Sequence, residues 1–166
     1  MGFKMIKSKI SRKKEEKRDK LPIYDIDSSI ILEVIFNNPR ENDSRMLFQL
    51  SGYRNKYRLM VSSIVMGEVI YIISKEKDIK FKENCIEALK RIMLYHDVEV
   101  YRPSKTTIDK VDEVLATDTF FKSMDALVFA SALENKSKKF VTFDSDFLES
   151  KNLREKFKEV KIDDKA

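Results

Sequence analysis

Short apolar runs alternate along this chain with longer segments in which apolar residues recur every three or four positions. The first pattern predicts buried strands, and the second predicts amphipathic helices. The expected strands cover residues 23–27, 57–62, 98–101, 140–142 and 160–162, the last as an edge strand. The expected helices cover residues 28–36, 43–53, 81–94, 107–116, 125–135 (capped by Ser123) and 146–149, with one more that carries Glu68 and is capped by Ser63. This alternation predicts an α/β fold, a three-layer α/β/α domain with a mostly parallel central sheet.

Four acidic residues interrupt the apolar pattern. Asp27 and Asp144 follow two of the expected strands, whereas Glu68 and Asp125 lie on helix faces that are otherwise apolar. A carboxylate on a half-buried face costs several kcal/mol unless a cation or hydrogen-bond donors compensate it. Because ligands bind parallel sheets beyond the carboxyl ends of the strands, we expect Asp27 and Asp144 to lie at that edge. The four residues together predict a divalent-metal site, of the kind that cleaves phosphodiesters.

Taken one at a time, three of these carboxylates have a structural explanation. Asp27 and Asp144 suit helix N-caps. Asp125 suits the first turn of a helix, where the helix dipole favours negative charge. Glu68 has no such explanation, because the residues four positions before and after it are isoleucines on the same helix face. We therefore interpret the four residues as one site.

The counts of cysteine, histidine and glycine limit the kinds of catalytic or metal site that the chain can form. Cys85 and His96 are each the only residue of their kind, which excludes a disulfide framework, a cysteine-based metal motif and a catalytic triad. The chain has three glycines and no glycine-rich phosphate loop. It has neither an export signal nor an apolar run that could span a membrane. We therefore expect a cytoplasmic protein with oxygen metal ligands and no membrane association.

The net charge of +5 comes from the start of the chain. Residues 1–20 contain nine basic and three acidic residues, whereas the remainder is close to neutral. We therefore divide the chain into a basic leader, residues 1–20, and one domain, residues 21–166, which begins at Leu21-Pro22. Two interpretations of the leader stay open: an arm that binds nucleic-acid phosphates, or a solvated and partly disordered segment.

Four sequence motifs carry a resemblance to a known family. Ile26-Asp27-Ser28-Ser29-Ile30-Ile31 resembles the opening motif of PIN-domain nucleases, and residues 62–68, which end in Glu68, resemble their second motif. Residues 124–133 and 141–147 are similar to the third and fourth motifs. The motifs occur in the family's order, with spacings of 41, 57 and 19 residues between successive acids. The resemblance covers about residues 21–163.

The resemblance implies a PIN-like fold and a Mg²⁺- or Mn²⁺-dependent endoribonuclease that hydrolyses RNA phosphodiester bonds. The catalytic metal ligands would be Asp27, Glu68, Asp125 and Asp144. Asp146 would bind the metal directly or through water, and Ser28 and Thr142 would hold a ligand or a water in place. A set of hard oxygen ligands fits Mg²⁺ rather than zinc.

The resemblance also implies partners. The substrate would be single-stranded or structured RNA, and many compact members of the family are toxins that form homodimers and are inhibited by a small antitoxin protein. The basic leader departs from the minimal toxin pattern, so RNA processing without an antitoxin stays open. Five basic residues between the first two acids are candidates for RNA binding, with solvated helix faces as the alternative explanation: Arg40, Arg45, Arg54, Lys56 and Arg58.

Two other interpretations compete with this one. Residues 25–29 also resemble the opening motif of haloacid-dehalogenase phosphatases, in which Asp25 would be the nucleophile. That class needs a paired acidic motif, for which Asp163-Asp164 is poorly positioned, and it leaves Glu68 and Asp125 unexplained. The remaining alternative is a catalytically inactive PIN-like scaffold that binds RNA or protein.

Overall fold

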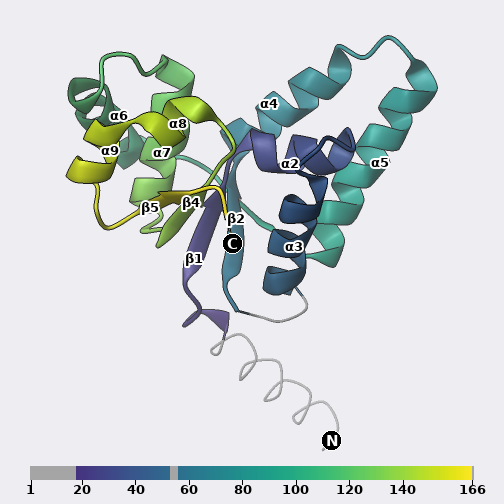
Figure 1. Cartoon of the computed structure of the whole chain (residues 1–166), viewed down its shortest axis with the longest axis horizontal. Helices are drawn as coiled ribbons and strands as arrows, with labels where there is room; N and C mark the ends of the chain where they lie inside the picture. Colours follow the sequence, from purple (N-terminus) through teal and green to yellow (C-terminus); the bar gives the residue numbers. More distant parts are fainter. Residues whose placement is uncertain (1–17, 53–55, 166) are drawn as a thin grey trace, which may run out of the picture.

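The centre of the molecule is a sheet of parallel strands (Figure 1). The structure, a computed structural model, describes residues 18–52 and 56–165, in which five strands follow the order β3-β2-β1-β4-β5. The strands are β1 (Ile23–Ile26), β2 (Arg58–Ser62), β3 (Glu99–Tyr101), β4 (Lys139–Val141) and β5 (Lys161–Asp163). In register, Asp25 of β1 is opposite Met60 of β2 and Phe140 of β4. All five strands therefore begin at one edge of the sheet, the amino edge, and end at the other, the carboxyl edge.

Eight helices of the described residues cover the sheet (Figure 1). On one side lie α2 (Ser28–Ile35), α3 (Glu41–Gly52), α4 (Ser63–Ser74) and α5 (Ile79–Tyr95). On the other lie α6 (Lys105–Thr117), α7 (Ser123–Glu134), α8 (Ser145–Glu149) and α9 (Lys151–Lys156). The helices α4 and α5 form a hairpin that extends away from the sheet. The predicted three-layer α/β/α fold is confirmed, with a described sheet that is wholly parallel.

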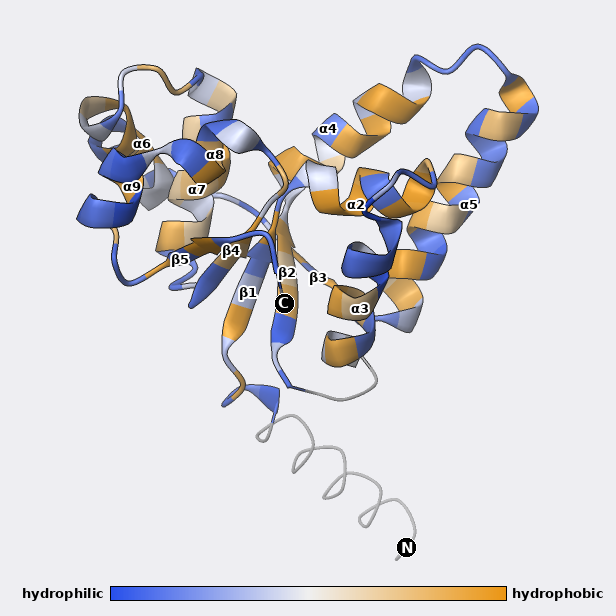
Figure 2. Ribbon diagram, viewed as in Figure 1, coloured by the Kyte–Doolittle hydropathy of each residue, from blue (hydrophilic) through white to orange (hydrophobic). Residues whose placement is uncertain are grey.

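Aromatic packing joins the sheet to the α7 side. Phe129 of α7 is fully buried, and its ring meets Phe140 of β4 edge-on at a centroid distance of 5.5 Å. It meets Phe157, which follows α9, in the same way at 5.7 Å. Figure 2 shows apolar positions concentrated in the strands and on the helix turns that face them. These contacts connect the sheet to α7 and to the residue that follows α9.

Some predicted boundaries are wrong. Ser62 rather than Ser63 caps α4, since its hydroxyl accepts a hydrogen bond from the Val65 amide at 3.3 Å. Ser123 is the first residue of α7 rather than its cap, and Lys122 in the cap position makes no side-chain hydrogen bond to the helix. The short helix α9 was not expected at all, because six residues are too few to establish a helical period.

The predicted basic leader falls mostly outside the described residues, which begin at Arg18. Among the helices of the described part of the chain, none has both the length and the apolar character needed to cross a membrane.

Candidate active site

Asp27 lies at the carboxyl edge, directly after β1 and in the N-cap position of α2. Its side chain makes no capping hydrogen bond. Instead, Oδ2 accepts hydrogen bonds from the hydroxyls of Ser29 and Thr142, both at 3.0 Å. Asp27 is 6% exposed, and burial raises the pKa of its carboxyl, as does the charge of Asp144. The N-cap explanation therefore does not account for Asp27, whose carboxylate is held by Ser29 and Thr142.

Glu68 approaches the same edge from α4. The buried stripe of α4 consists of Val65, Val69 and Ile73. Glu68 itself is largely exposed and lies beside that stripe, on the face that it shares with the half-buried Ile64 and Ile72. Its position follows from the start of α4 at Ser63, directly after β2 ends at Ser62, and from the packing of α4 against α2.

The electrostatics of Glu68 connect it to the rest of the site. Partial burial is the largest effect on its carboxyl and raises its pKa. The Ser28 hydroxyl lies near enough to Glu68 to oppose that rise in pKa, whereas the charges of Asp27, Asp125 and Asp144 add to it. Ser28 also lies 3.5 Å from the Asp27 carboxylate, at the limit of a hydrogen bond. Ser28 therefore stands between Asp27 and Glu68.

Asp125 and Asp144 complete the group from the other side of the sheet. Asp125 occupies the first turn of α7 and is partly buried, which raises the pKa of its carboxyl, and the charge of Asp144 raises it further. Asp144 lies three residues beyond the end of β4 and caps α8, since it accepts a hydrogen bond from the Asp146 amide at 2.8 Å. The N-cap interpretation of Asp144 thus holds alongside its place in the acidic group. Asp146 is exposed and pairs with Lys122 at 3.8 Å.

The four carboxylates suit a divalent cation in charge and in donor chemistry. Asp27, Glu68 and Asp125 each have a raised pKa to which at least one other member of the group contributes, so the four negative charges repel one another. A cation between them would relieve this repulsion, and carboxylate oxygens are the ligands that Mg²⁺ and Mn²⁺ favour. Within residues 18–52 and 56–165, no three acidic, histidine or cysteine side chains already form a ready metal-binding cluster. The acids interact electrostatically but are not arranged for coordination.

Ser29 is a site residue that the sequence reading did not single out. Its hydroxyl donates to Asp27 and accepts a hydrogen bond from the Phe143 amide at 3.0 Å. It thereby connects the start of α2 to the loop after β4, as Thr142 does by donating to Asp27 while it accepts a hydrogen bond from the Asp144 amide at 2.9 Å. The signal was present, because a serine two residues after a strand-ending Asp lies in the first helical turn, within reach of that carboxylate.

The predicted RNA-binding residues do not form one patch. Arg40 lies at the carboxyl edge, where its guanidinium stacks 3.7 Å from the Phe143 ring centroid and pairs with Asp164 at 3.0 Å. Lys56 and Arg58 lie at the amino edge, before and at the start of β2. The remaining candidates are Arg45, which pairs with Glu41 on α3, and Arg54, which lies outside the described residues.

Asp25, the nucleophile of the phosphatase alternative, is closed off from solvent. It is 2% exposed, inside β1 rather than at the edge, and its carboxylate accepts hydrogen bonds from Ser137 and from Asn135, the latter at 3.1 Å. The acidic pair proposed for that class is also engaged elsewhere, Asp163 with Lys139 and Lys161 and Asp164 with Arg40. A nucleophile must reach its substrate, so this geometry disfavours the phosphatase interpretation.

The fold and the acidic edge together define a PIN domain. The sequence model of that domain matches residues 24–153, and the chain belongs to the PIN domain family. No curated protein gives a match to the chain.

Solved structures support the same fold. VapBC2 from Rickettsia felis bound to a promoter DNA fragment has a TM-score of 0.65 and 20% identity over 84% of this chain and 96% of that one. DNA-bound VapBC from Salmonella typhimurium has a TM-score of 0.61 and 21% identity over 86% and 98%. VapC20 from Mycobacterium tuberculosis, described as a toxin that cleaves the sarcin-ricin loop, has a TM-score of 0.58 and 18% identity over 77% and 95%. At these identities the likeness establishes the fold.

Proposed function

We propose that this chain is a Mg²⁺- or Mn²⁺-dependent endoribonuclease. Its metal ligands would be Asp27, Glu68, Asp125 and Asp144, with Asp146 as an accessory ligand. The observation that supports the proposal is electrostatic: burial raises the pKa of Asp27, Glu68 and Asp125 at the carboxyl edge of the sheet, and the charges of neighbouring acids, Asp144 among them, raise it further. Membership of the PIN domain family supports it independently.

The residues of the site would have different roles in RNA hydrolysis. A bound Mg²⁺ or Mn²⁺ would supply the Lewis acidity that lowers the pKa of an attacking water and offsets charge on the phosphoryl oxygens. The hydroxyls of Ser29 and Thr142 would hold Asp27 in one orientation, and Ser28 would do the same for Glu68. No imidazole takes part, because the single histidine, His96, packs against Phe48 at the end of α5. The proton of the attacking water would therefore pass to a carboxylate or to solvent.

A protein partner is the second element of the proposal. The similar structures include VapBC assemblies and a toxin–antitoxin complex from Klebsiella pneumoniae. On this chain, Phe120 is 94% exposed and Met124 is 55% exposed beside Asp125. Exposed apolar side chains at a charged site suit a protein contact. We propose that an antitoxin or a second copy of the chain covers them, and that the protein acts in the cytoplasm.

The decisive test compares wild type with Asp125→Asn on labelled single-stranded RNA, with Mg²⁺, with Mn²⁺ and with EDTA. Asp109→Asn is the matched control, because Asp109 is an exposed carboxylate on α6, away from the acidic group. We expect cleavage by wild type and by the control, and loss of cleavage in EDTA and in Asp125→Asn. Thermal stability supplies a second readout: either metal ion should raise the Tm of wild type and the control more than that of Asp125→Asn.

The outcomes separate this proposal from its alternative. Cleavage that persists in both EDTA and Asp125→Asn would refute a metal site of these acids. RNA binding by wild type without cleavage, and without stabilisation by metal, would favour an inactive scaffold. That alternative draws on the absence of a ready metal-binding cluster among the described residues.

A further inference from the structure

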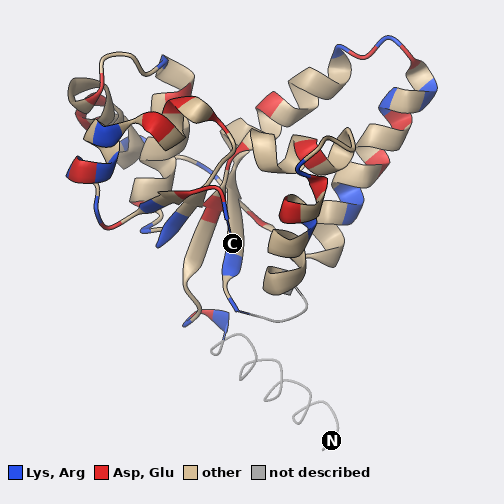
Figure 3. Cartoon of the chain, in the orientation of Figure 1, with Lys and Arg blue, Asp and Glu red and all other residues tan. Residues whose placement is uncertain are grey.

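The parallel sheet separates the charges of the domain into two groups. Because all described strands run the same way, the segments that precede them lie together at the amino edge. These segments, with the first residue of each strand, contain nine basic and four acidic residues. The basic residues are Arg18, Lys20, Lys56, Arg58, Lys136, Lys138, Lys139, Lys158 and Lys161. Figure 3 shows blue at the starts of the strands and red where α4, α7 and α8 meet the carboxyl edge.

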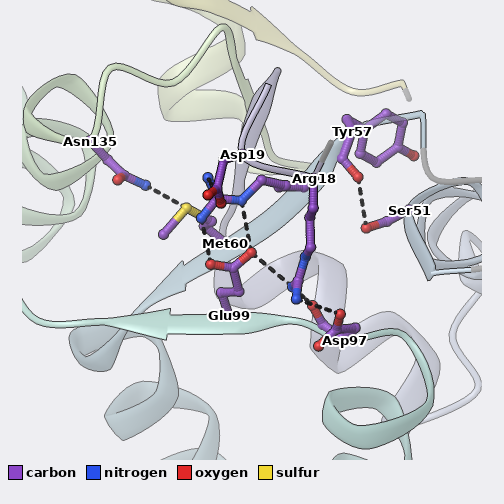
Figure 4. A network of polar contacts seen from close by, with 9 residues as sticks. Arg18, Asp19, Ser51, Tyr57, Met60, Asp97, Glu99 and Asn135 are labelled. Carbon is purple, nitrogen blue, oxygen red and sulfur yellow. Dashed lines mark hydrogen bonds and ion pairs between the residues drawn. The ribbon is translucent and has the colours of Figure 1, made fainter. Parts of the chain in front are cut away.

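An ion-pair network fixes the point at which the leader joins this edge (Figure 4). Arg58 donates two hydrogen bonds to the Glu99 carboxylate, at 2.8 and 2.6 Å. Arg18 pairs with Glu99 at 2.9 Å and with Asp97 at 2.8 Å. The first described residue of the chain, Arg18, therefore lies at the amino edge.

A groove at the amino edge is lined by lysines that take no part in this ion-pair network. The groove has a volume of about 440 Å³ and is lined by Lys110, Lys136 and Lys138, with Glu134 and Glu159. None of the three lysines forms an ion pair within the described residues, whereas Arg18, Arg58, Lys139 and Lys161 all do. The carboxylate of Glu134 is already engaged by the hydroxyls of Ser104 and Thr107. The groove thus presents ammonium groups to solvent.

We infer that this groove forms a second RNA-binding surface, opposite the acidic site. The inference rests on the proposed ribonuclease function for its choice of RNA. An acidic edge repels a phosphate backbone wherever a metal does not offset it, so affinity for a long RNA must come from elsewhere on the protein. A strand of three to five residues spans about 10–17 Å at about 3.3 Å per residue, so one RNA must extend across the domain to contact both edges. Long or structured RNA would benefit from this surface, and short oligonucleotides would not.

The test measures RNA binding by the full chain in EDTA, by fluorescence anisotropy over a range of salt concentrations. Lys110→Gln, Lys136→Gln and Lys138→Gln are combined in one variant. The control combines Lys77→Gln, Lys80→Gln and Lys90→Gln, which remove the same charge from the α4–α5 hairpin, where all three lysines are exposed. Circular dichroism and Tm establish that both variants are folded. Each protein is measured with a long RNA, a short RNA and duplex DNA.

The expected result follows from counterion release. Each lysine that contacts a single-stranded phosphate contributes about 0.7 to the slope of log affinity against log salt, so the groove variant should lose about 2 from that slope. If affinities converge near 1 M salt, binding of the long RNA at about 0.1 M salt should weaken about a hundredfold. The control should keep the wild-type slope, and the short RNA should show no difference between the two variants.

Equal loss of slope in both variants would mean that only net charge matters, and it would overturn the inference. Tighter binding to duplex DNA than to RNA would overturn the choice of RNA. Because binding is measured in EDTA, failure of the proposed nuclease is a separate result. If the chain cleaves RNA but the groove variant keeps the wild-type slope, the second surface is refuted and the nuclease proposal stands. If the groove variant loses slope but the chain does not cleave RNA, the nuclease proposal is refuted and the second surface stands.

Discussion

Asp25 is buried in β1, and the free-energy cost of burying its charge should make the stability of the folded protein depend on pH. One carboxylate oxygen accepts from Ser137 and Asn135, whereas the other, Oδ1, has no hydrogen-bond partner within the described residues. The Tyr101 hydroxyl lies near enough to favour the charged form as well. Burial outweighs all three groups and raises the pKa of Asp25 from 3.8 to about 6. Asp25→Asn should therefore stabilise the protein near neutral pH.

The magnitude follows from the linkage between proton binding and folding. The pKa rises by about 2 units on folding, and one unit corresponds to about 1.4 kcal/mol, so the ionised carboxyl destabilises the native state by about 3 kcal/mol. Because the folded pKa lies above the unfolded value, this penalty is absent below about pH 4, grows as the pH rises from there to about 6, and is complete above that. Asparagine cannot ionise, and its amide can donate towards the Tyr101 hydroxyl.

Urea denaturation of wild type and Asp25→Asn across this pH range checks the prediction. We expect the variant to gain about 2–3 kcal/mol at about pH 8 and little at about pH 4. Asp27 also titrates, but it does so in both proteins, so the difference between them isolates Asp25. Asp109→Asn, which removes an exposed carboxylate, should change stability little at any pH. A difference between Asp25→Asn and wild type that stays constant with pH would refute the reasoning.

Two further predictions concern the site and the core. Ser29→Ala should remove a hydrogen bond from Asp27 and weaken Mg²⁺ or Mn²⁺ binding about 10- to 100-fold in a calorimetric titration, whereas Ser123→Ala, at an exposed position, should not; equal affinities would show that Ser29 does not orient Asp27. Phe129→Ala should lower the free energy of unfolding by about 3–5 kcal/mol in urea denaturation, because its fully buried ring contacts Phe140 and Phe157; a loss below about 1 kcal/mol would mean that the surrounding rings refill the space.

The fold and the acidic edge could be predicted from the sequence because neither depends on the exact residues at which helices and strands begin and end. Strand direction alone brings Asp27 and Asp144 to one edge, so errors of a residue at Ser63 or Ser123 did not matter. Glu68, in contrast, was placed by its position on a helix and not by strand direction. Helical spacing correctly grouped it with neighbouring isoleucines, but that face is partly exposed, because burial on α4 depends on where α2 and β2 lie.

The contacts between distant segments could not be predicted from the sequence. Ser29 joins the start of α2 to the loop after β4, more than a hundred residues away, and no local pattern records that pairing. The motif around Asp25 suggests only a nucleophile, because a motif gives no information about burial. Arg40 and Arg58 are close in sequence but lie at opposite edges, since the chain passes from one edge to the other between them.

The same topology that gathers the acids also gathers the lysines, and this constrains how the two edges can act together. Residues after the strands lie at one edge and residues before them at the other. A chain with a net charge of +5 therefore has acidic residues gathered at one edge and basic residues at the other. Long-range attraction of RNA to such a domain would favour the amino edge, whereas the proposed chemistry needs the carboxyl edge. A substrate that reaches both edges must be longer than the strands that separate them. The strength of long-RNA binding and the rate of cleavage should therefore respond to different substitutions, the first to Lys136 and Lys138 and the second to Asp125.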